Sequence, residues 1–393
     1  MWRKYDAYLV GYYGMQNSGD DALLLATLYG AETQLGCNNF AVATASDFDC
    51  NMYLHAKATL TYPQQFKGQN RLQHYYHAAR SKRIIFGGGS VLHNSHDINL
   101  KRKLLSLSNA KESLALGVSI GPFADNEAEQ ACAKFLNEIG FVGVRDRHSL
   151  DIAKRIAPDA NVDLTFDLAP VLRTHANFKL ANEERKGIVF NMCPVALDAH
   201  GRTNAEAETR RITHICQVIY RIWEETGEPI TLLNMNKQAN SDCDISAAIC
   251  HTLHNKVPIE TIPYTSNVFD LIEDLSRFKA AVGMRLHTNI LAYMANTPTI
   301  SINYHDKCRE WCQQIGLPDE YRFEADKFLP QDLAEILIHG VKKGFEVPLL
   351  PLFAGVRLSQ NNWRFTYEQA KNISGHPTLQ QGESHLRHTE KRL

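Results

Sequence analysis

The chain has 393 residues, of which 44% are hydrophobic and 22% are charged, and its formal net charge is −1. This is the composition of an ordinary soluble globular protein, and the length exceeds the size at which one hydrophobic core keeps growing, so we expect two domains. The near-zero charge excludes a global field that would steer the protein to nucleic acid or to an anionic membrane. Any anion that it binds must be held by local cations.

The sequence contains no signal for a membrane or for export. No segment reaches the roughly 18 apolar residues that span a bilayer, and the N-terminus lacks the basic and then apolar layout of a signal peptide. The nine cysteines are scattered and odd in number, as expected for reduced thiols. We therefore expect a cytoplasmic protein.

A glycine-rich turn follows the first expected strand, Tyr8–Gly11, and leads into an apolar helix from Ala22. Its candidate ligand-binding residues are Gly14, Asn17 and Asp20, because glycines admit a ligand close to the backbone and the helix N–H groups point at it. The turn matches neither a phosphate-binding P-loop nor a strict dinucleotide fingerprint. A tight turn without a ligand remains the alternative.

Strands and helices alternate along most of the chain, which is typical of doubly wound parallel sheets. The expected strands of the first half are Tyr8–Gly11, Asn39–Thr44, Arg83–Phe86, Ser113–Val118 and Phe141–Arg145, with a helix over about Glu127–Ile139. The second half is expected to contain the strands Gly187–Met192, Pro229–Asn234, Glu260–Ile262, Lys279–Val282 and Thr299–Asn303, and the helices Ala205–Thr226, Ser241–His254, Asn267–Phe278 and one after His287.

The two runs are separated by the polar stretch Arg173–Lys186. We therefore predict an α/β fold of two Rossmann-like doubly wound domains facing a cleft, with residues 1–172 as the N-terminal domain and 173–347 as the C-terminal domain. Residues 348–393 should be irregular, with one helix around Trp363–Ile373 and a mobile tail after Gly375.

Polar and glycine residues at strand ends are the candidate site residues, since α/β ligands bind there. Gly88 and Gly89 belong to a triglycine after the strand Arg83–Phe86, where side chains would otherwise block a ligand. A bend needed only for packing is the alternative for this triglycine.

Arg285 and His287 follow the strand Lys279–Val282, and two residues apart in an extended turn they would point the same way. Arginine offers a fork for phosphate or carboxylate, and histidine carries a proton near neutral pH. A structural histidine bonded to a backbone carbonyl is the plainer alternative.

Arg145 also ends a strand and is the favoured cleft cation of its segment, while Ser149 is a candidate cap for the next helix. Asp167 could bind a ligand, orient an arginine or cap a turn. Asp242 and Asp244 are interpreted as helix-start residues. The cysteines and histidines at Cys250, His251, His254, Cys308 and Cys312 lack the paired spacing of a zinc site.

Together these segments resemble the polysaccharide pyruvyl transferase family over roughly residues 5 to 320. The residues that carry the resemblance are Gly11-Tyr12-Tyr13-Gly14, Asn17, Gly19-Asp20, Gly87-Gly88-Gly89, Gly117 to Pro122, Arg145-Asp146, Ser149, Asp167, Arg285-Leu286-His287, Pro298, Tyr304 and Lys307. One departure is Val118-Ser119-Ile120-Gly121, where members of the family often carry more glycine.

The resemblance implies a two-lobed fold like that of GT-B glycosyltransferases and transfer of a pyruvyl group from phosphoenolpyruvate to two hydroxyls of a sugar. It places Arg145, Arg285, Leu286 and His287 at phosphoenolpyruvate, and Asn17 and Asp20 toward the acceptor. The expected catalytic residues are His287, Asp20 and Asp21. The expected substrate-binding residues are Arg145, Arg285, Leu286, Asn17, Gly14, Gly88, Gly89, Asp167, Tyr304 and Lys307.

No metal or cofactor is expected, because arginines can neutralise the phosphate, and phosphoenolpyruvate is the donor substrate. The acceptor is a lipid-linked, nucleotide-linked or polymeric saccharide, and the sequence does not fix it. The C-terminal region around Arg357, Trp363 and Arg364 could meet a membrane-bound acceptor, but packing against a lobe is favoured.

Two other functions compete with pyruvyl transfer. The same architecture serves glycosyltransferases that use a nucleotide sugar, for which Glu310 and Glu324 are weak candidates to bind a ribose. A sugar- or anion-binding protein without turnover is the other alternative.

Overall fold

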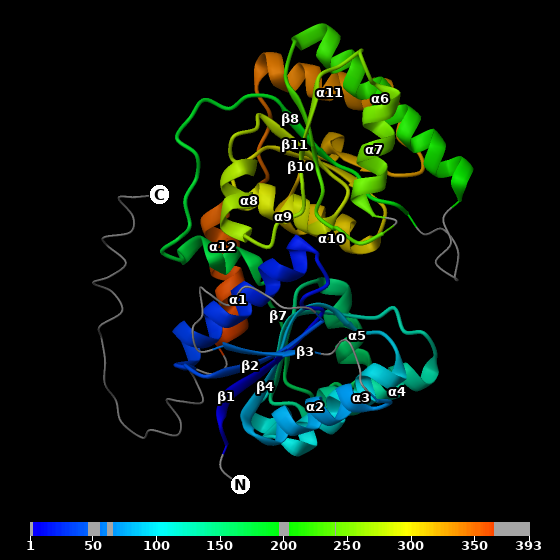
Figure 1. Ribbon diagram of the computed structural model, residues 1–393. Coiled ribbons are helices and arrows are strands. Elements are labelled where there is room, and N and C mark those ends of the chain that lie inside the picture. Colours follow the sequence, from blue (N-terminus) through cyan, green and yellow to red (C-terminus); the bar gives the residue numbers. More distant parts are fainter. Residues whose placement is uncertain (1–2, 46–55, 61–65, 196–203, 240, 365–393) are drawn as a thin grey trace.

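The computed structural model describes residues 3–45, 56–60, 66–195, 204–239 and 241–364. They form two parallel sheets that lie one above the other in Figure 1, with helices on the faces of each. The first sheet has seven strands in the order β3-β2-β1-β4-β5-β6-β7, and the second has six in the order β10-β9-β8-β11-β12-β13. In each sheet the first three strands are added toward one edge and the later strands toward the other, so the strand order changes direction beside β1 and beside β8, as in Rossmann folds. The predicted fold class is confirmed.

The first sheet ends at Leu164, and the short helix η2 (Ala169–Thr174) follows it in the same lobe. Its strands are β1 (Tyr5–Val10), β2 (Phe40–Thr44), β3 (Ala56–Leu60), β4 (Ser81–Leu92), β5 (Leu114–Ile120), β6 (Phe141–Val144) and β7 (Val162–Leu164). Its helices are α1 (Ser18–Leu35), α2 (Gln69–Ala79), α3 (Ser95–Leu107), α4 (Asn126–Glu138) and α5 (Arg147–Ile156), with the short helices η1 (Ala110–Glu112) and η2 (Ala169–Thr174).

The second sheet begins at Ile188. Its strands are β8 (Ile188–Asn191), β9 (Ile230–Leu233), β10 (Ile259–Ile262), β11 (Ala280–Gly283), β12 (Thr299–Asn303) and β13 (Arg322–Glu324). Its helices are α6 (Ala205–Thr226), α7 (Asp242–Thr252), α8 (Val268–Leu275), α9 (Leu286–Met294), α10 (Asp306–Ile315) and α11 (Pro330–Lys343), with the short helix η3 (Asp319–Tyr321). The change of sheet falls around the polar stretch 173–186, while the domain boundaries themselves stay a prediction.

Helix α1 lies between the two sheets in Figure 1 and packs on η2 of its own lobe and on α8 and α9 of the other. Its apolar residues are buried on several sides, including Leu23, Leu24 and Leu28, which explains why the sequence of this helix has almost no polar face. The position matters for function because the glycine-rich turn at its N-terminus therefore opens between the lobes.

The triglycine does not end its strand, contrary to the sequence prediction. Strand β4 runs through it to Leu92, and its pairing with β5 shifts register between Gly89 and Leu92. Gly88 and Gly89 have φ values of 72° and 84°, which favour glycine, and a Cβ on Gly87 would collide with Thr27 of α1. The glycines therefore serve first to bend the strand and to admit α1.

The C-terminal region is more regular than predicted. Helix α12 (Leu352–Gln360) and the short helix η4 (Asn361–Trp363) return the chain to the first lobe, where they lie beside α1 in Figure 1. Trp363 is buried, and a Cβ on Gly30 of α1 would collide with its ring. This packing confirms the favoured alternative for Trp363. The predicted helix beyond it and the tail after Gly375 lie outside the described residues.

Within the described part of the chain, no helix has both the length and the continuous apolar character that crossing a bilayer requires.

Candidate active site

A cavity of about 220 Å³ lies where the two lobes meet. The first lobe lines it with Tyr12, Asn17, Asp20, Gly89, Ser90 and Arg145, and the second with Arg285, Leu286, His287, Tyr304 and Lys307. All of these residues follow strand ends or lie in the glycine bend of β4. The carboxyl edges of both sheets therefore face the same space, as the doubly wound topology requires.

Arg145 follows β6, and hydrogen bonds and an ion pair hold its side chain at the cavity. Its Nε donates to Ser119 Oγ at 2.8 Å, and its Nη1 donates to Asp167 Oδ2 at 3.1 Å. Both side chains of the ion pair are almost fully buried. From the second lobe, the Gln314 amide donates to the backbone carbonyl of Arg145 at 2.9 Å. The guanidinium is thus fixed before any ligand arrives, which reduces the entropy lost on binding.

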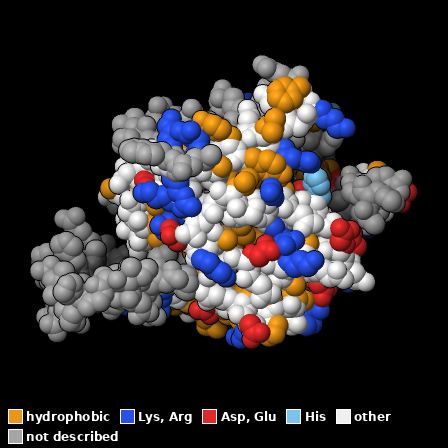
Figure 2. All heavy atoms as spheres, turned by 90° about the horizontal axis from the view of Figure 1, so that it is seen from below, with side chains coloured by type: hydrophobic (Ala, Val, Ile, Leu, Met, Phe, Trp, Pro, Cys, Tyr) orange, Lys and Arg blue, Asp and Glu red, His pale blue; other side chains and the backbone are white. Residues whose placement is uncertain are grey.

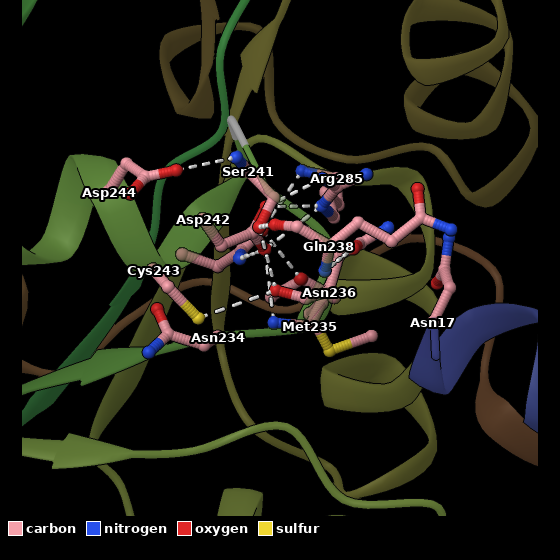
Figure 3. Close-up of polar contacts among 12 residues, drawn as sticks. Asn17, Asn234, Met235, Asn236, Gln238, Ser241, Asp242, Cys243, Asp244 and Arg285 are labelled. Carbon is pink, nitrogen blue, oxygen red and sulfur yellow. Dashed lines mark hydrogen bonds and ion pairs between the residues drawn. The ribbon is translucent and has the colours of Figure 1, made fainter. Parts of the chain in front are cut away.

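Arg285 reaches the same cavity from the other lobe. Its Nε and Nη2 donate to the Asp242 carboxylate at 2.6–2.9 Å, and Asp242 is completely buried. That carboxylate also accepts from the Asn191 amide at 2.8 Å and from the Met235 N–H at 3.0 Å. Figure 3 shows Asp242 at the centre of this network with Arg285 beside it. Asp242 begins α7, as predicted, but its charge also orients the arginine.

The two lobes are joined beside the site by backbone contacts. The Ser18 N–H donates to Met235 O at 2.9 Å, and the Lys237 N–H donates to Gln16 O at 3.1 Å, on either side of an isolated antiparallel bridge between Asn17 and Asn236. Asn17 also caps α1 by accepting from the Gly19 N–H at 3.0 Å. The turn that carries Asn17 is therefore attached to the segment that leads into Asp242 (Figure 3).

His287 lies in the first turn of α9, which begins at Leu286, and not in the extended turn that the sequence predicted. Arg285 is the residue before that helix and has extended backbone angles, so the two side chains still reach one cavity. His287 Nε2 is 3.8 Å from Asp167 Oδ2 and has no hydrogen-bond partner among the described residues. A Cβ on Gly19 would collide with the imidazole.

Burial lowers the pKa of His287 to about 4, although Asp167 opposes the shift; the nearby cations Arg145, Lys307 and Arg285 add to it. The imidazole is thus neutral near pH 7. Burial lowers the pKa of Lys307 as well, with a contribution from Arg145. Three cations therefore line one small cavity: Arg145 and Arg285, each paired with a buried carboxylate, and Lys307, which lies near Asp20.

Asp20 and Asp21 begin α1 but have different environments. Asp20 lines the cavity, and burial, together with Asp21, raises its pKa to about 7. Asp21 accepts from the Tyr264 hydroxyl at 2.8 Å, and burial raises its pKa to about 6. Since successive helical residues point in directions about 100° apart, only Asp20 faces the cavity. A carboxyl with a pKa near 7 can take or give a proton at neutral pH.

Most of the predicted site residues line the cavity, and four do not. Gly14, Gly88, Asp21 and Asp167 are outside the lining. Asp167 instead lies behind Arg145 and His287, and of its alternatives the structure supports both orienting an arginine and capping a turn. It also accepts from the Ala169 N–H at 3.0 Å. A Cβ on Gly88 would collide with Leu23, so this glycine serves packing.

Several residues of the site were not predicted. Tyr12 and Ser90 line the cavity, Ser119 positions Arg145, and Asp242 holds Arg285. Ser90 directly follows the predicted Gly89, and Tyr12 stands two residues before the predicted Gly14, which is the signal that could have found them. Ser119 stands in the stretch that departs from the family, and its hydroxyl also donates to Asp146 at 2.8 Å.

The helix-capping prediction for Ser149 is wrong, because Asp146 caps α5 by accepting from the Ser149 N–H at 2.7 Å. The weak ribose candidates are engaged elsewhere. Glu324 pairs with Arg309, and Glu310 faces Asp146 across the lobes, where burial and the neighbouring carboxylate raise its pKa to about 7.

Solved structures of the same architecture cover nearly the whole chain. A putative UDP-N-acetylglucosamine 2-epimerase from Listeria monocytogenes is 8% identical, with a TM-score of 0.65, over 95% of this chain and 98% of that one. UDP-GlcNAc 2-epimerase from Methanocaldococcus jannaschii is 9% identical, with a TM-score of 0.60, over 92% and 99%. The Neisseria meningitidis enzyme bound to UDP-GlcNAc is 7% identical, with a TM-score of 0.56, over 93% and 100%. At these identities the likeness shows the two-domain fold alone, the GT-B-like arrangement that the sequence predicted.

The sequence comparison is more specific. The family model described as polysaccharide pyruvyl transferase matches residues 17–306. This span contains nine of the eleven lining residues, including Arg145, Arg285 and His287; Tyr12 precedes it and Lys307 follows it. The matched span exceeds half of the chain, and the chain belongs to the polysaccharide pyruvyl transferase family.

Proposed function

We propose that the cavity binds phosphoenolpyruvate and transfers its pyruvyl group to two hydroxyls of a sugar in a polysaccharide or its precursor. The observation that carries the proposal is the convergence of two guanidinium groups and one ammonium group, from opposite lobes, on a single small cavity. Phosphoenolpyruvate bears a phosphate and a carboxylate on three carbons. A site for it needs fixed cations on more than one side, and each charge-assisted contact contributes about 1.5–3 kcal/mol.

The proposed reaction protonates the methylene carbon of phosphoenolpyruvate, so that the adjacent carbon becomes an oxocarbenium-like electrophile. One sugar hydroxyl attacks that carbon and loses its proton, and the carbon–oxygen bond to phosphate breaks. The second hydroxyl then attacks the same carbon, loses its proton and closes the ketal. One proton is taken up at carbon, two are released from hydroxyls, and inorganic phosphate leaves.

His287 and Asp20 are the groups that we assign to proton transfer. Burial is the main cause of the lowered pKa of His287, and the nearby cations lower it further. A bound anion offsets the part due to the cations, so we expect the pKa of the imidazole to rise when the donor binds. Asp167 at 3.8 Å supports the charged form. Asp20, with a pKa of about 7, is then the acceptor-side base. Lys307 and Arg145 neutralise the departing phosphate, and the proposal involves no metal ion.

The test is the mass of the product formed from phosphoenolpyruvate and a panel of sugar acceptors, including lipid-linked and nucleotide-linked ones. A ketal adds the mass of pyruvate less water, and one phosphate is released for each ketal formed. Nucleotide release from a sugar donor, with a mass gain of one sugar, would instead establish glycosyl transfer. Tight binding of phosphoenolpyruvate without phosphate release over the whole panel would indicate a protein that only binds.

A further inference from the structure

Helix α2 exposes an apolar surface on the first lobe. Leu72 is 58% exposed and Tyr76 is 55% exposed, and Phe66, just before the helix, is 55% exposed. Leu72 and Tyr76 are four residues apart, so they lie on the same side of the helix. Three of the nine large hydrophobic side chains that the described structure exposes are therefore in one stretch of eleven residues.

The opposite side of α2, which faces the sheet, carries two histidines beside the apolar residues Tyr75 and Ala78, which pack on the core of the first lobe. His74 Nδ1 is 2.7 Å from the Tyr8 hydroxyl of β1, and the buried His77 ring lies 5.6 Å from the ring of Tyr5 and 5.8 Å from that of Tyr8. The helix thus leaves the large side chains of Leu72 and Tyr76 outward, although a surface helix ordinarily buries such residues because apolar burial stabilises the fold. Exposed apolar surface of this kind marks an interaction site.

The sequence around α2 is strongly basic in a chain whose net charge is −1. Residues 66–111 contain one acid, Asp97, and nine cations: Lys67, Arg71, Arg80, Lys82, Arg83, Lys101, Arg102, Lys103 and Lys111. Acids from elsewhere pair with three of the cations, Lys82, Arg83 and Arg102. None of the ion pairs between described residues involves Lys67, Arg71, Arg80 or Lys103. Because acidic residues elsewhere bring the net charge of the whole chain to −1, the total charge does not reveal this local excess of cations.

The basic and apolar groups are close to one another. The Arg80 guanidinium lies 5.3 Å from the centre of the Tyr76 ring, and α2 packs beside α3, which carries Lys103. Figure 2 shows the underside of the molecule, where hydrophobic side chains lie next to Lys and Arg over the upper part of the view. Since α2 follows β3, it begins at the carboxyl edge of the sheet, so Phe66 is at the end nearer the cleft.

We propose that the outer side of α2, made of Phe66, Leu72 and Tyr76 with Lys67, Arg71 and Arg80, docks on an anionic lipid surface. Aromatic and aliphatic side chains flanked by cations enter the headgroup region while the cations meet lipid phosphates. A nucleic acid would satisfy the cations but would leave Leu72 in water. Docking does not depend on which group the cleft transfers.

The experiment is cosedimentation of the full chain with vesicles of phosphatidylcholine and phosphatidylglycerol, and with vesicles of phosphatidylcholine alone. We expect binding to the anionic vesicles that weakens with added salt. The double variant Leu72→Ser/Tyr76→Ser and the charge variant Arg71→Glu should each lower the partition coefficient about tenfold. Tyr220→Ser is the matched control, because it removes an aromatic side chain that is 41% exposed on α6 of the second lobe, and it should bind as the parent does.

Three outcomes would overturn the proposal. The first is that the parent protein fails to bind anionic vesicles, and the second is that the double variant binds them as the parent does. The third is that Tyr220→Ser lowers the partition coefficient as much as the double variant does. Binding to single-stranded RNA with the same response to Arg71→Glu, and no vesicle binding, would assign the surface to nucleic acid instead. Far-UV circular dichroism of each variant separates a docking defect from unfolding. Because no substrate is present, a failure of pyruvyl transfer leaves this measurement unaffected.

Discussion

At the scale of single residues, the imidazole of His287 is a group of the cavity that no hydrogen bond satisfies at Nε2 among the described residues. Its Nε2 atom is buried and faces Asp167 across the lobes. A buried polar atom without a partner is destabilising unless a ligand satisfies it. We therefore interpret the free Nε2 as a contact kept for the substrate.

Replacing His287 by alanine should lower turnover by about 10²–10⁴-fold, the usual contribution of a positioned proton donor or acceptor. Phosphate release from phosphoenolpyruvate in the presence of an acceptor measures the effect. His148→Ala, at an exposed histidine on α5, is the control and should keep the parent rate. Turnover of His287→Ala near that of the parent would end the assignment.

Asp242 acts through Arg285. Asp242→Asn keeps the shape but removes the charge that holds the guanidinium, so we expect the KM for phosphoenolpyruvate to rise about 10–100-fold, the equivalent of 1.5–3 kcal/mol. The change in kcat should be smaller, because Arg285 is assigned to binding. Steady-state kinetics with varied donor concentration separate the two constants.

The matched control for Asp242→Asn is Asp244→Asn, on the same helix. Asp244 accepts from the Ser241 N–H in the capping box of α7 and makes no contact with Arg285 in the described network. Its replacement should cost about 1 kcal/mol of stability and leave the KM unchanged. An equal rise of the KM in both variants would mean that helix stability, and not charge, positions the arginine.

The raised pKa of Asp20 makes stability depend on pH. An unfolded carboxyl releases its proton near pH 4, whereas burial holds the proton of folded Asp20 up to about pH 7. Between these values the native state binds more protons than the unfolded state, so this group makes stability fall as pH rises. Asp20→Asn should flatten that fall between pH 4 and 7, as measured by Tm at each pH. Asp319→Asn, at a side chain that is 92% exposed, should leave the profile as it is.

At the scale of elements, the N-terminus of α1 determines how closely the lobes approach. Gly19 lies against the His287 ring, and the adjacent Ser18 donates from its N–H to Met235 O and from its hydroxyl to Thr265 O, at 2.9 Å and 2.8 Å. Helix α1 is therefore part of the first lobe in sequence but packs on both lobes. Because Gly19 has no Cβ, the imidazole of His287 can lie over the turn.

Gly19→Ala should displace either His287 or the end of α1 and lower kcat by at least tenfold, because misplacement of about 1 Å can cost 10²-fold. Gly36→Ala is the control at the other end of the same helix, where a Cβ meets no atom within 4 Å but φ is 62°. It should lower stability by about 1 kcal/mol and keep kcat. Activity of Gly19→Ala equal to that of the control would show that the close approach is dispensable.

At the scale of the whole molecule, the segment formed by α12 and η4 connects the second lobe back to the first. Asn362 of η4 is fully buried in the first lobe, where its Oδ1 accepts from the Gly117 N–H at 2.8 Å and from Thr165 Oγ1 at 2.7 Å. Its Nδ2 donates to Phe166 O at 2.9 Å. Helix α12 therefore couples the second lobe to the sheet edge that carries Arg145.

Asn362→Ala should reduce the free energy of unfolding by about 2–4 kcal/mol, because it leaves buried backbone groups without partners. Urea unfolding measures the loss. The neighbouring Asn361→Ala is the control, since Asn361 Oδ1 has no hydrogen-bond partner among the described residues. If the two variants unfold at the same urea concentration, the buried hydrogen bonds of the Asn362 side chain do not stabilise the folded protein.

The sequence alone determined the architecture and most of the cavity lining. The bounds of helix α6 and strand β12 match the predicted residues. Such elements can be predicted because the periodicity of apolar residues and the residues that form turns are both visible within a short stretch of sequence. Arg145 and Arg285 were found for the same reason, since each stands directly after a strand whose end must face the cleft. The ordered set of such positions also identified the family.

Only the tertiary structure decided which groups work together. Asp242 and Arg285 are 43 residues apart, and Asp167 meets His287 from the other lobe, so no local pattern records either pair. Asp20 and Asp21 are adjacent in sequence, yet the direction of the helix assigns one to the cavity and the other to Tyr264. The outward side of α2 was likewise hidden, because a side chain's exposure depends on which elements pack against it. Local propensity sets the elements, whereas long-range contacts set the charges, burial and access on which the chemistry depends.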